Sequence, residues 1–244
     1  MNKVAVVSGA GSGVGRAVVS RLARDGWSVA LIGRNRASLD ETIRLALSGA
    51  GTGAHRAPPL EAFPCDIGDQ RAVSQAASHI QQSLGTPVAL VNCAGTNIPR
   101  RSLDVLTVED FDALMQTNLH GAFYFVHAFL PMLRSAGAGT IVNILSDAAI
   151  IPNAKAGAGY CASKFGLRGL TQSINIEQRQ HGIRACGIFP GDINTPLLDR
   201  RPTPPTPEQR AKMIQPEDVA ECVMLAISLP PRAVIEELLL RPPY

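Results

Sequence analysis

The chain has 244 residues, of which 45% are hydrophobic and 18% charged, so it can bury a large core and is too apolar to be disordered. Its 23 basic and 20 acidic residues leave a formal net charge of +3, which gives no reason to expect a nucleic-acid or membrane-surface partner. Five widely spaced cysteines lack metal-ligand spacing, and no segment resembles a signal peptide or membrane span; we therefore expect a cytoplasmic protein with reduced thiols and no metal site.

Short segments rich in β-branched residues alternate with helix-period segments along most of the chain. The predicted strands are Val4–Val7, Val29–Ile32, Leu60–Cys65, Val88–Val91, Gly139–Leu145, Ile183–Phe189 and Ile235–Leu240. The predicted helices include Val14–Asp25, Asn35–Ser48, Ala72–Leu84 and Phe165–Gln180. Because the strands show little polar alternation, they fit parallel strands buried on both faces. We therefore predict a single α/β domain over residues 1–244, with helices on both faces of a doubly wound parallel sheet of about seven strands.

Two stretches break this alternation. Residues 48–59 are rich in glycine and proline and are predicted to form a flexible surface loop. Residues 196–216 contain prolines at positions 196, 202, 204, 205, 207 and 216, and a short helix is expected near Thr206–Glu208. We expect the segment 196–216 to form a lid over the substrate, because mobile loops above strand ends commonly close on ligands.

The first predicted strand runs into a glycine-rich turn, Ser8–Gly15, and then into a helix. This order places free backbone N–H groups and the positive end of the helix against a pyrophosphate. The glycines fit the spacing GxxxGxG and not GxGxxG. The cofactor contacts predicted in this turn are Gly9, Ser12, Gly13, Val14 and Gly15.

The second predicted strand ends at Gly33, near where an NAD-binding domain would carry an acidic residue for the ribose 2′-hydroxyl. The sequence instead continues with Arg34, Asn35 and Arg36. A guanidinium without a nearby carboxylate suits a 2′-phosphate, which arginine can bind through two hydrogen bonds. We therefore predict NADP (NADPH) over NAD, with Arg34 as the contact. The alternative is that Arg34 and Arg36 are solvated residues at the start of a helix.

Tyr160 and Lys164 lie four residues apart at the start of a helical segment, so they share one helix face. A neighbouring ammonium favours the phenolate and lowers the pKa of a tyrosine. The spacing YxxxK is common by chance, so it indicates catalysis only in the company of other motifs. Polar motifs follow three of the predicted strands, at Asn92–Gly95, Asn143–Ser146 and Pro190–Thr195. Strand ends of this kind are where sites lie in a parallel sheet.

The motifs follow one another in the order GxxxGxG turn, Asn92–Gly95, Asn118, Ser146, Tyr160 with Lys164, and Pro190–Thr195. Together they resemble the short-chain dehydrogenase/reductase family in its compact form, over nearly the whole chain from Lys3 to about Leu240. The resemblance implies a Rossmann-like fold and an NAD(P)-dependent oxidoreductase that interconverts a carbonyl and an alcohol by hydride transfer. It also implies a small-molecule substrate and assembly as a homodimer or homotetramer.

The same resemblance implies residue roles. Tyr160 would be the general acid or base, and Ser146 would hydrogen-bond the substrate oxygen. Lys164 would hold the nicotinamide ribose and lower the pKa of Tyr160, while Asn118 would hold a water that relays protons. The further cofactor contacts that it implies are Asp66, Ile67, Asn92, Ala94, Gly95, Pro190, Gly191 and Thr195, together with Tyr160 and Lys164.

Three residues depart from the usual family pattern without putting the reaction type in doubt. Ser8 replaces a threonine and keeps its hydroxyl, and Cys93 replaces a second asparagine, which we interpret as tolerated packing. Leu145 stands where a serine often precedes the catalytic one, so Ser146 is the only candidate there.

Other polar residues near the predicted strand ends have simpler interpretations. Asp147 and Asp192 could reach the substrate, but capping is the favoured role. Arg100 and Arg101 could attract an anionic substrate, but solvated loop charge is favoured. The five scattered histidines are assigned to the surface or to packing. Two other functions stay open: an epimerase or dehydratase on the same fold, which usually carries an extra substrate domain, and a non-catalytic protein that senses NADP(H).

Overall fold

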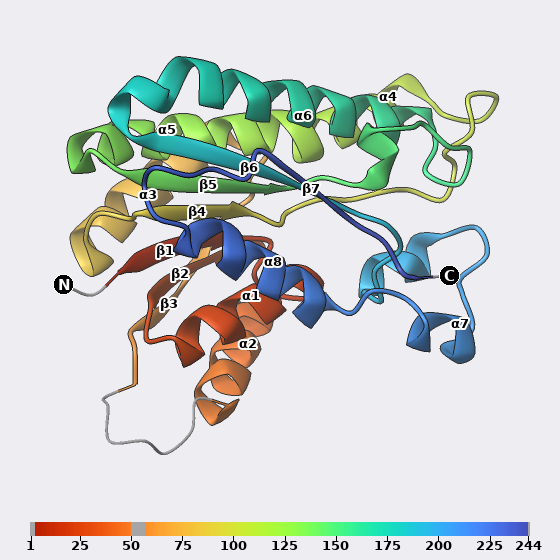
Figure 1. Cartoon of the computed structure of the whole chain (residues 1–244). Coiled ribbons are helices and arrows are strands. Elements are labelled where there is room, and N and C mark those ends of the chain that lie inside the picture. The colour runs from red at the N-terminus through yellow and green to blue at the C-terminus, as the bar shows by residue number, and fades with distance from the viewer. Residues whose placement is uncertain (1–2, 50–56, 244) are drawn as a thin grey trace.

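The computed structural model describes residues 3–49 and 57–243 (Figure 1). Its strands form one parallel sheet in the order β3-β2-β1-β4-β5-β6-β7. The strands are β1 (Val4–Ser8), β2 (Ser28–Gly33), β3 (Leu60–Pro64), β4 (Ala89–Asn92), β5 (Gly139–Ile144), β6 (Ile183–Pro190) and β7 (Glu237–Leu240). The doubly wound parallel sheet predicted from the sequence is confirmed.

Helices pack on both faces of the sheet, as Figure 1 shows. One face is covered by α1 (Gly13–Arg24), α2 (Arg36–Gly49) and α8 (Pro216–Ser228), and the other by α3 (Gln70–Leu84), α5 (Gly121–Ala136) and α6 (Ala158–Gln178). Neighbouring residues of β1 pack on opposite faces of the sheet: Val7 lies in the core under α1, α2 and α8, and Val6 lies in the core under α3 and α5. Both faces of the strand are therefore apolar, which explains the absence of polar alternation.

Shorter helical segments lie in the connections: α4 (Val108–Met115), the π-helical turn η1 (Gln116–His120), the 3-10 turns η2 (Asp147–Ala149), η3 (Arg179–His181) and η4 (Pro196–Arg200), and α7 (Pro207–Ala211). The short helix expected after Thr206 is α7, and a capping box between Thr206 and Gln209 fixes its start. Among the described residues, no helix is long and apolar enough to cross a membrane.

The sheet reverses its strand order between β1 and β4. At their carboxyl ends Ser8 and Asn92 are direct partners in the register, and the Ser8 hydroxyl donates a hydrogen bond to Asn92 Oδ1 over 3.4 Å. Ligands of doubly wound sheets bind in the crevice outside such a reversal. A ligand site is therefore expected among the loops after β1, β4, β5 and β6.

Two boundary predictions need correction. The helix predicted as Phe165–Gln180 begins at Ala158, because Gly157, at φ +84°, turns the chain against Arg101 immediately before it. The predicted loop 48–59 is shortened at its start, since α2 continues through Gly49. Residues 50–56 of that predicted loop lie outside the described residues.

Candidate active site

The turn after β1 needs its glycines for steric reasons. Gly9 has φ +66°, and a Cβ there would lie 2.7 Å from the Ala94 backbone nitrogen. A Cβ on Gly15 would lie 2.2 Å from the Gly9 carbonyl oxygen, so α1 could not start so close to the turn. Gly13 has φ +49° and faces the Thr195 side chain, whose Cγ2 would be 3.1 Å from an added Cβ. The structure thus brings three predicted glycines together with Ala94 and Thr195.

The start of α1 suits a bound pyrophosphate. The Ser12 side chain makes no capping hydrogen bond, and the first turn holds no acidic residue. The first backbone N–H groups of a helix have no intrahelical partner, so here they remain available to an anion at the positive end of the helix. Val14 is buried beneath this turn. The residues present therefore fit the phosphates of a dinucleotide.

The structure after β2 assigns different roles to Arg34 and Arg36, between which the sequence could not decide. Arg36 opens α2 and forms an exposed ion pair with Asp40, with 2.9 Å between Nε and Oδ1. Arg34, two residues before the start of α2, is exposed and forms no ion pair with a described residue. Arg36 is thus a helix-start residue, as in the alternative interpretation, whereas the Arg34 guanidinium is available for a phosphate.

The loop after β3 places the next predicted contacts. The Asp66 carboxylate is exposed and accepts a 2.9 Å hydrogen bond from the Gly68 backbone nitrogen. Ile67 is buried and packs against Gly121, the first residue of α5. Asp66 is therefore positioned at the surface by its own turn, while Ile67 anchors that turn to the core.

A buried amide network connects the strand ends. Asn92 Nδ2 donates to Asn143 Oδ1 over 2.7 Å, and Asn143 Nδ2 donates to the Thr171 hydroxyl over 2.8 Å. Both asparagines are at most 2% exposed, so these bonds offset the cost of burying them. In the described residues Asn92 fixes the carboxyl ends of β1, β4 and β5 relative to one another.

Asn118 lies in the π-helical turn and is fully buried. Its Oδ1 accepts from the Thr96 backbone nitrogen over 2.8 Å, and its Nδ2 donates to the Thr96 carbonyl and the Ser163 hydroxyl, each over 3.0 Å. Both Nδ2 hydrogens are used within the protein, and the side chain holds the loop after β4 against α6. The expected role of Asn118 in holding a water stays a prediction.

Lys164 is 3% exposed, and its Nζ donates to the Ile144 carbonyl oxygen over 2.8 Å. Burial lowers the pKa of this ammonium to about 8, while the nearby Cys93 acts in the opposite direction. Lys164 Nζ is 5.7 Å from the centroid of the Tyr160 ring, one turn earlier on α6. The predicted sharing of one helix face by this pair is confirmed.

Tyr160 does not show the expected shift. Burial raises its pKa to about 12, the Ser146 hydroxyl reduces this rise, and the Asp147 carboxylate adds to it. The predicted lowering of the Tyr160 pKa by Lys164 is not found, because burial has the largest effect and Lys164 is not among the groups that shift this pKa. The phenol accordingly holds its proton at neutral pH.

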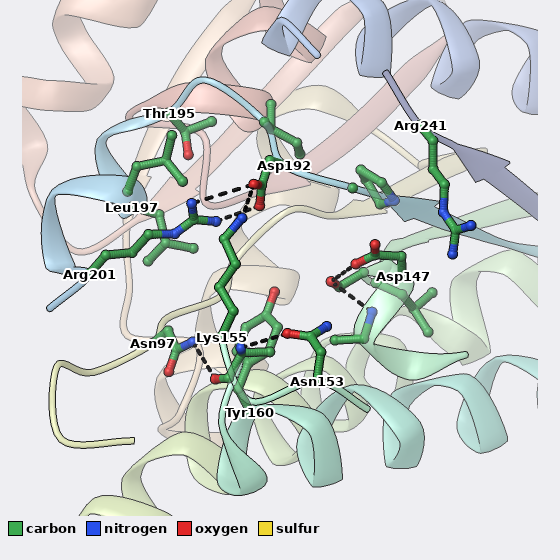
Figure 2. A pocket seen from close by; sticks show the side chains of 18 of the residues that line it. Asn97, Asp147, Asn153, Lys155, Tyr160, Asp192, Thr195, Leu197, Arg201 and Arg241 are labelled. Carbon is green, nitrogen blue, oxygen red and sulfur yellow. Dashed lines mark hydrogen bonds and ion pairs between the residues drawn. The ribbon is translucent and has the colours of Figure 1, made fainter. Parts of the chain in front are cut away.

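A cavity of about 500 Å³ opens above these groups (Figure 2). The predicted site residues that line it are Ser146, Tyr160, Pro190, Gly191 and Thr195. Ser146 also starts the turn η2, where its hydroxyl donates to Asp147 Oδ1 and accepts from the Ala148 nitrogen, both over 3.2 Å. Leu197, from the predicted lid, also lines the cavity. Further lining residues that the sequence did not assign to the site are Asn97, Asn153, Lys155 and Arg241, which follows β7. No cluster of side chains suited to a metal ion occurs in the described part of the chain.

Two interpretations of charged residues are wrong. Arg101 is not a solvated loop residue: it is 7% exposed and lines the cavity, whereas Arg100 is exposed and pairs with Asp110 over 3.0 Å. Asp192 is not a capping group, since its carboxylate forms ion pairs with Lys155 and Arg201 across the cavity. Lys155 and Arg200, which contact Arg101, and Lys155, which contacts Asp192, lie far away in the sequence, so local pattern does not reveal these contacts.

The family model described as short chain dehydrogenase matches residues 3–205, and the chain belongs to that family. Sepiapterin reductase of Chlorobaculum tepidum is 33% identical over 248 residues, covering 99% of this chain and 97% of that protein. Human (3R)-3-hydroxyacyl-CoA dehydrogenase is 36% identical over 236 residues, covering 92% and 88%. A metagenomic short-chain oxidoreductase in complex with NADP has a TM-score of 0.83 at 31% identity, covering 99% of this chain and 97% of that one.

These comparisons confirm the predicted family, the Rossmann-like fold and the class of enzyme. The chain is an NAD(P)-dependent oxidoreductase acting on CH–OH groups. The structure of that metagenomic relative contains NADP.

Proposed function

We propose that this protein interconverts a carbonyl compound and an alcohol with NADP(H), and that Tyr160 transfers the proton. The observation that carries the proposal is the cavity in which the Ser146 and Tyr160 side chains lie together with Thr195, which itself contacts the glycine turn at Gly13. Substrate and nicotinamide can meet only where a cofactor cradle and a proton donor share one space. The names of two relatives, a reductase and a dehydrogenase, support the same pair of reactions.

The acid–base chemistry follows from the protonation states. Bound NADPH supplies the hydride. Tyr160, with a pKa of about 12, carries its proton at neutral pH and can give it to the oxygen of the reduced carbonyl. The Ser146 hydroxyl stabilises the charge that develops on that oxygen. Lys164, with a pKa of about 8, carries a proton at Nζ near neutral pH, 5.7 Å from the centroid of the Tyr160 ring.

The remaining roles belong to the same proposal. Residues 1–244 act as one catalytic domain, and the residues of the segment 196–216 nearest the cavity, Leu197, Leu198 and Arg201, serve as its lid. Asn118 positions the loop after β4, as its three hydrogen bonds support. Arg34 would bind the 2′-phosphate of NADP, for which its exposed guanidinium has no competing carboxylate among the described residues.

A panel of aldehydes and ketones, with NADPH absorbance as the readout, tests the assignment. Tyr160→Phe removes the proton donor while keeping the ring, so turnover should fall to background. Tyr124→Phe is the matched control, because that tyrosine lies on α5 beside Phe123 and His120 and does not line the cavity. Undiminished turnover by Tyr160→Phe would contradict the proposal.

A further inference from the structure

The cavity is charged to an extent that the overall composition does not suggest. Four cationic and two anionic side chains line it, an excess of two positive charges, whereas the entire chain carries a net charge of +3. The lining cations are Arg101, Lys155, Arg201 and Arg241, and the lining anions are Asp147 and Asp192. The cavity lining thus carries an excess of two positive charges, close to the net charge of the entire chain.

Arg101 is the buried centre of this charge. Its Nε donates to the Ile98 carbonyl over 2.7 Å, Nη1 to the Lys155 carbonyl over 3.1 Å, and Nη2 to the Arg200 carbonyl over 2.9 Å. All its described partners are neutral, so the positive charge is satisfied but not cancelled. Burial, and to a smaller extent Arg201, lowers the pKa of Arg101. The residue therefore fixes the loops that carry Lys155 and Arg201 while it adds to their positive field.

Asp192 is shared by two of the lining cations, Lys155 and Arg201. Arg201 and Lys155 come from different loops and both contact its carboxylate, as Figure 2 shows. Although burial raises the pKa of Asp192, hydrogen bonds from Arg201 and Lys155 hold it below its ordinary value, so the carboxylate is ionised at neutral pH. One carboxylate cannot neutralise two cations, and a second anion at this position would complete the charge balance.

We propose that the cavity selects carbonyl substrates that carry an anionic group, a carboxylate or a phosphate, and that Lys155 and Arg201 bind this group. The substrate anion competes with Asp192 for the two cations. Guanidinium groups suit such anions because they can donate two parallel hydrogen bonds. The inference rests on the proposed oxidoreductase function and names the substrate class of the same site.

Two substitutions distinguish anion binding from a purely structural ion pair. Asp192→Asn removes the competing carboxylate, so it should strengthen the binding of an anionic ligand relative to a neutral one. Lys155→Met removes one cation, so this substitution should weaken the binding of an anionic ligand relative to a neutral one. If the ion pairs served only to hold the two loops together, both variants would lose binding. Arg100→Gln is the matched control, because Arg100 neighbours Arg101 but is exposed and paired with Asp110.

The experiment is calorimetric titration of 4-formylbenzoate, its methyl ester and 4-formylphenyl phosphate into the protein, with and without NADP⁺. We expect the wild type to bind the better of the two anions at least ~10-fold more tightly than the ester, about 1.4 kcal/mol. Asp192→Asn should widen this ratio by about tenfold and Lys155→Met should narrow it by about tenfold, while Arg100→Gln leaves it unchanged. Raising the ionic strength should reduce the preference, because salt screens charge.

The comparison of the carboxylate with the phosphate shows which anion the site accommodates better. An ester that binds as well as both anions, no detectable binding of any of the three, or a shift of both variants in the same direction would overturn the proposal. Turnover with NADPH is measured separately. Turnover without anion preference would refute the inference alone, and anion preference without turnover would refute only the proposed reaction.

Discussion

The variant Lys164→Met tests how much the buried ammonium of Lys164 lowers the free energy of unfolding. The side chain is 3% exposed, and burial lowers its pKa from the ordinary 10.5 to about 8. One pKa unit corresponds to about 1.4 kcal/mol, so the protonated lysine destabilises the folded state by roughly 3.4 kcal/mol near neutral pH. The methionine variant carries no such charge.

This cost depends on pH in a defined direction. Between about pH 8 and pH 10.5 the unfolded chain retains the lysine proton while the folded protein releases it. The unfolded state then binds more protons, so the free energy of unfolding rises with pH across that window. From about pH 7 to about pH 10 the contribution of Lys164 should rise by roughly 2.5 kcal/mol. Relative to Lys164→Met, the wild type should gain stability by that amount.

Urea unfolding at a series of pH values measures this difference. Trp27 is the single tryptophan of the chain and is buried, so its fluorescence reports the loss of the core. Lys212→Met, a substitution of an exposed lysine, controls for the loss of one cation. A difference between wild type and Lys164→Met that stays constant within about 0.5 kcal/mol over this range would refute the reasoning.

Three further predictions follow from packing and charge. Gly15→Ala places a Cβ 2.2 Å from the Gly9 carbonyl oxygen, so it should destabilise the fold by about 2–3 kcal/mol in urea unfolding and abolish NADP binding in calorimetry. Arg34→Asp should lower the preference for NADP over NAD by about tenfold to hundredfold in the ratio of dissociation constants, and an unchanged ratio would contradict the role of Arg34. Asn118→Ala leaves the Thr96 backbone groups without their partner and should cost about 2–4 kcal/mol in urea; a loss below about 0.5 kcal/mol would show that this loop is held by other contacts.

The features that could be predicted from the sequence are those that short-range geometry dictates. The turn at Gly9–Gly15 was predictable because its backbone leaves no room for a Cβ, and glycine is the residue that satisfies this requirement. The strands were predictable because burial on both faces leaves them mostly apolar, without an alternation of polar and apolar residues. The start of α6 was not, because Gly157 and Gly159 owe their places to contacts with Arg101 and Leu114, which are distant in the sequence.

The charged lining of the cavity escaped prediction for a related reason. The side chain of Arg101 is buried because carbonyl groups of three separate loops converge on it. Asp192 meets one partner nine residues away and another 37 residues away. Sequence periodicity and spacing do not predict such contacts, because the contacts depend on how the loops after β4, β5 and β6 lie relative to one another. The pKa of Tyr160 escaped prediction likewise, since the spacing of Tyr160 and Lys164 says nothing of how deeply each is buried.

The same cations act on the substrate and on the proton donor. Arg201 lowers the pKa of Tyr160, although burial has the larger, opposite effect. A substrate anion bound to Arg201 would cancel part of that influence, and the pKa of the phenol would rise further. Tyr160 would then keep its proton more firmly, which suits its role as the acid in carbonyl reduction.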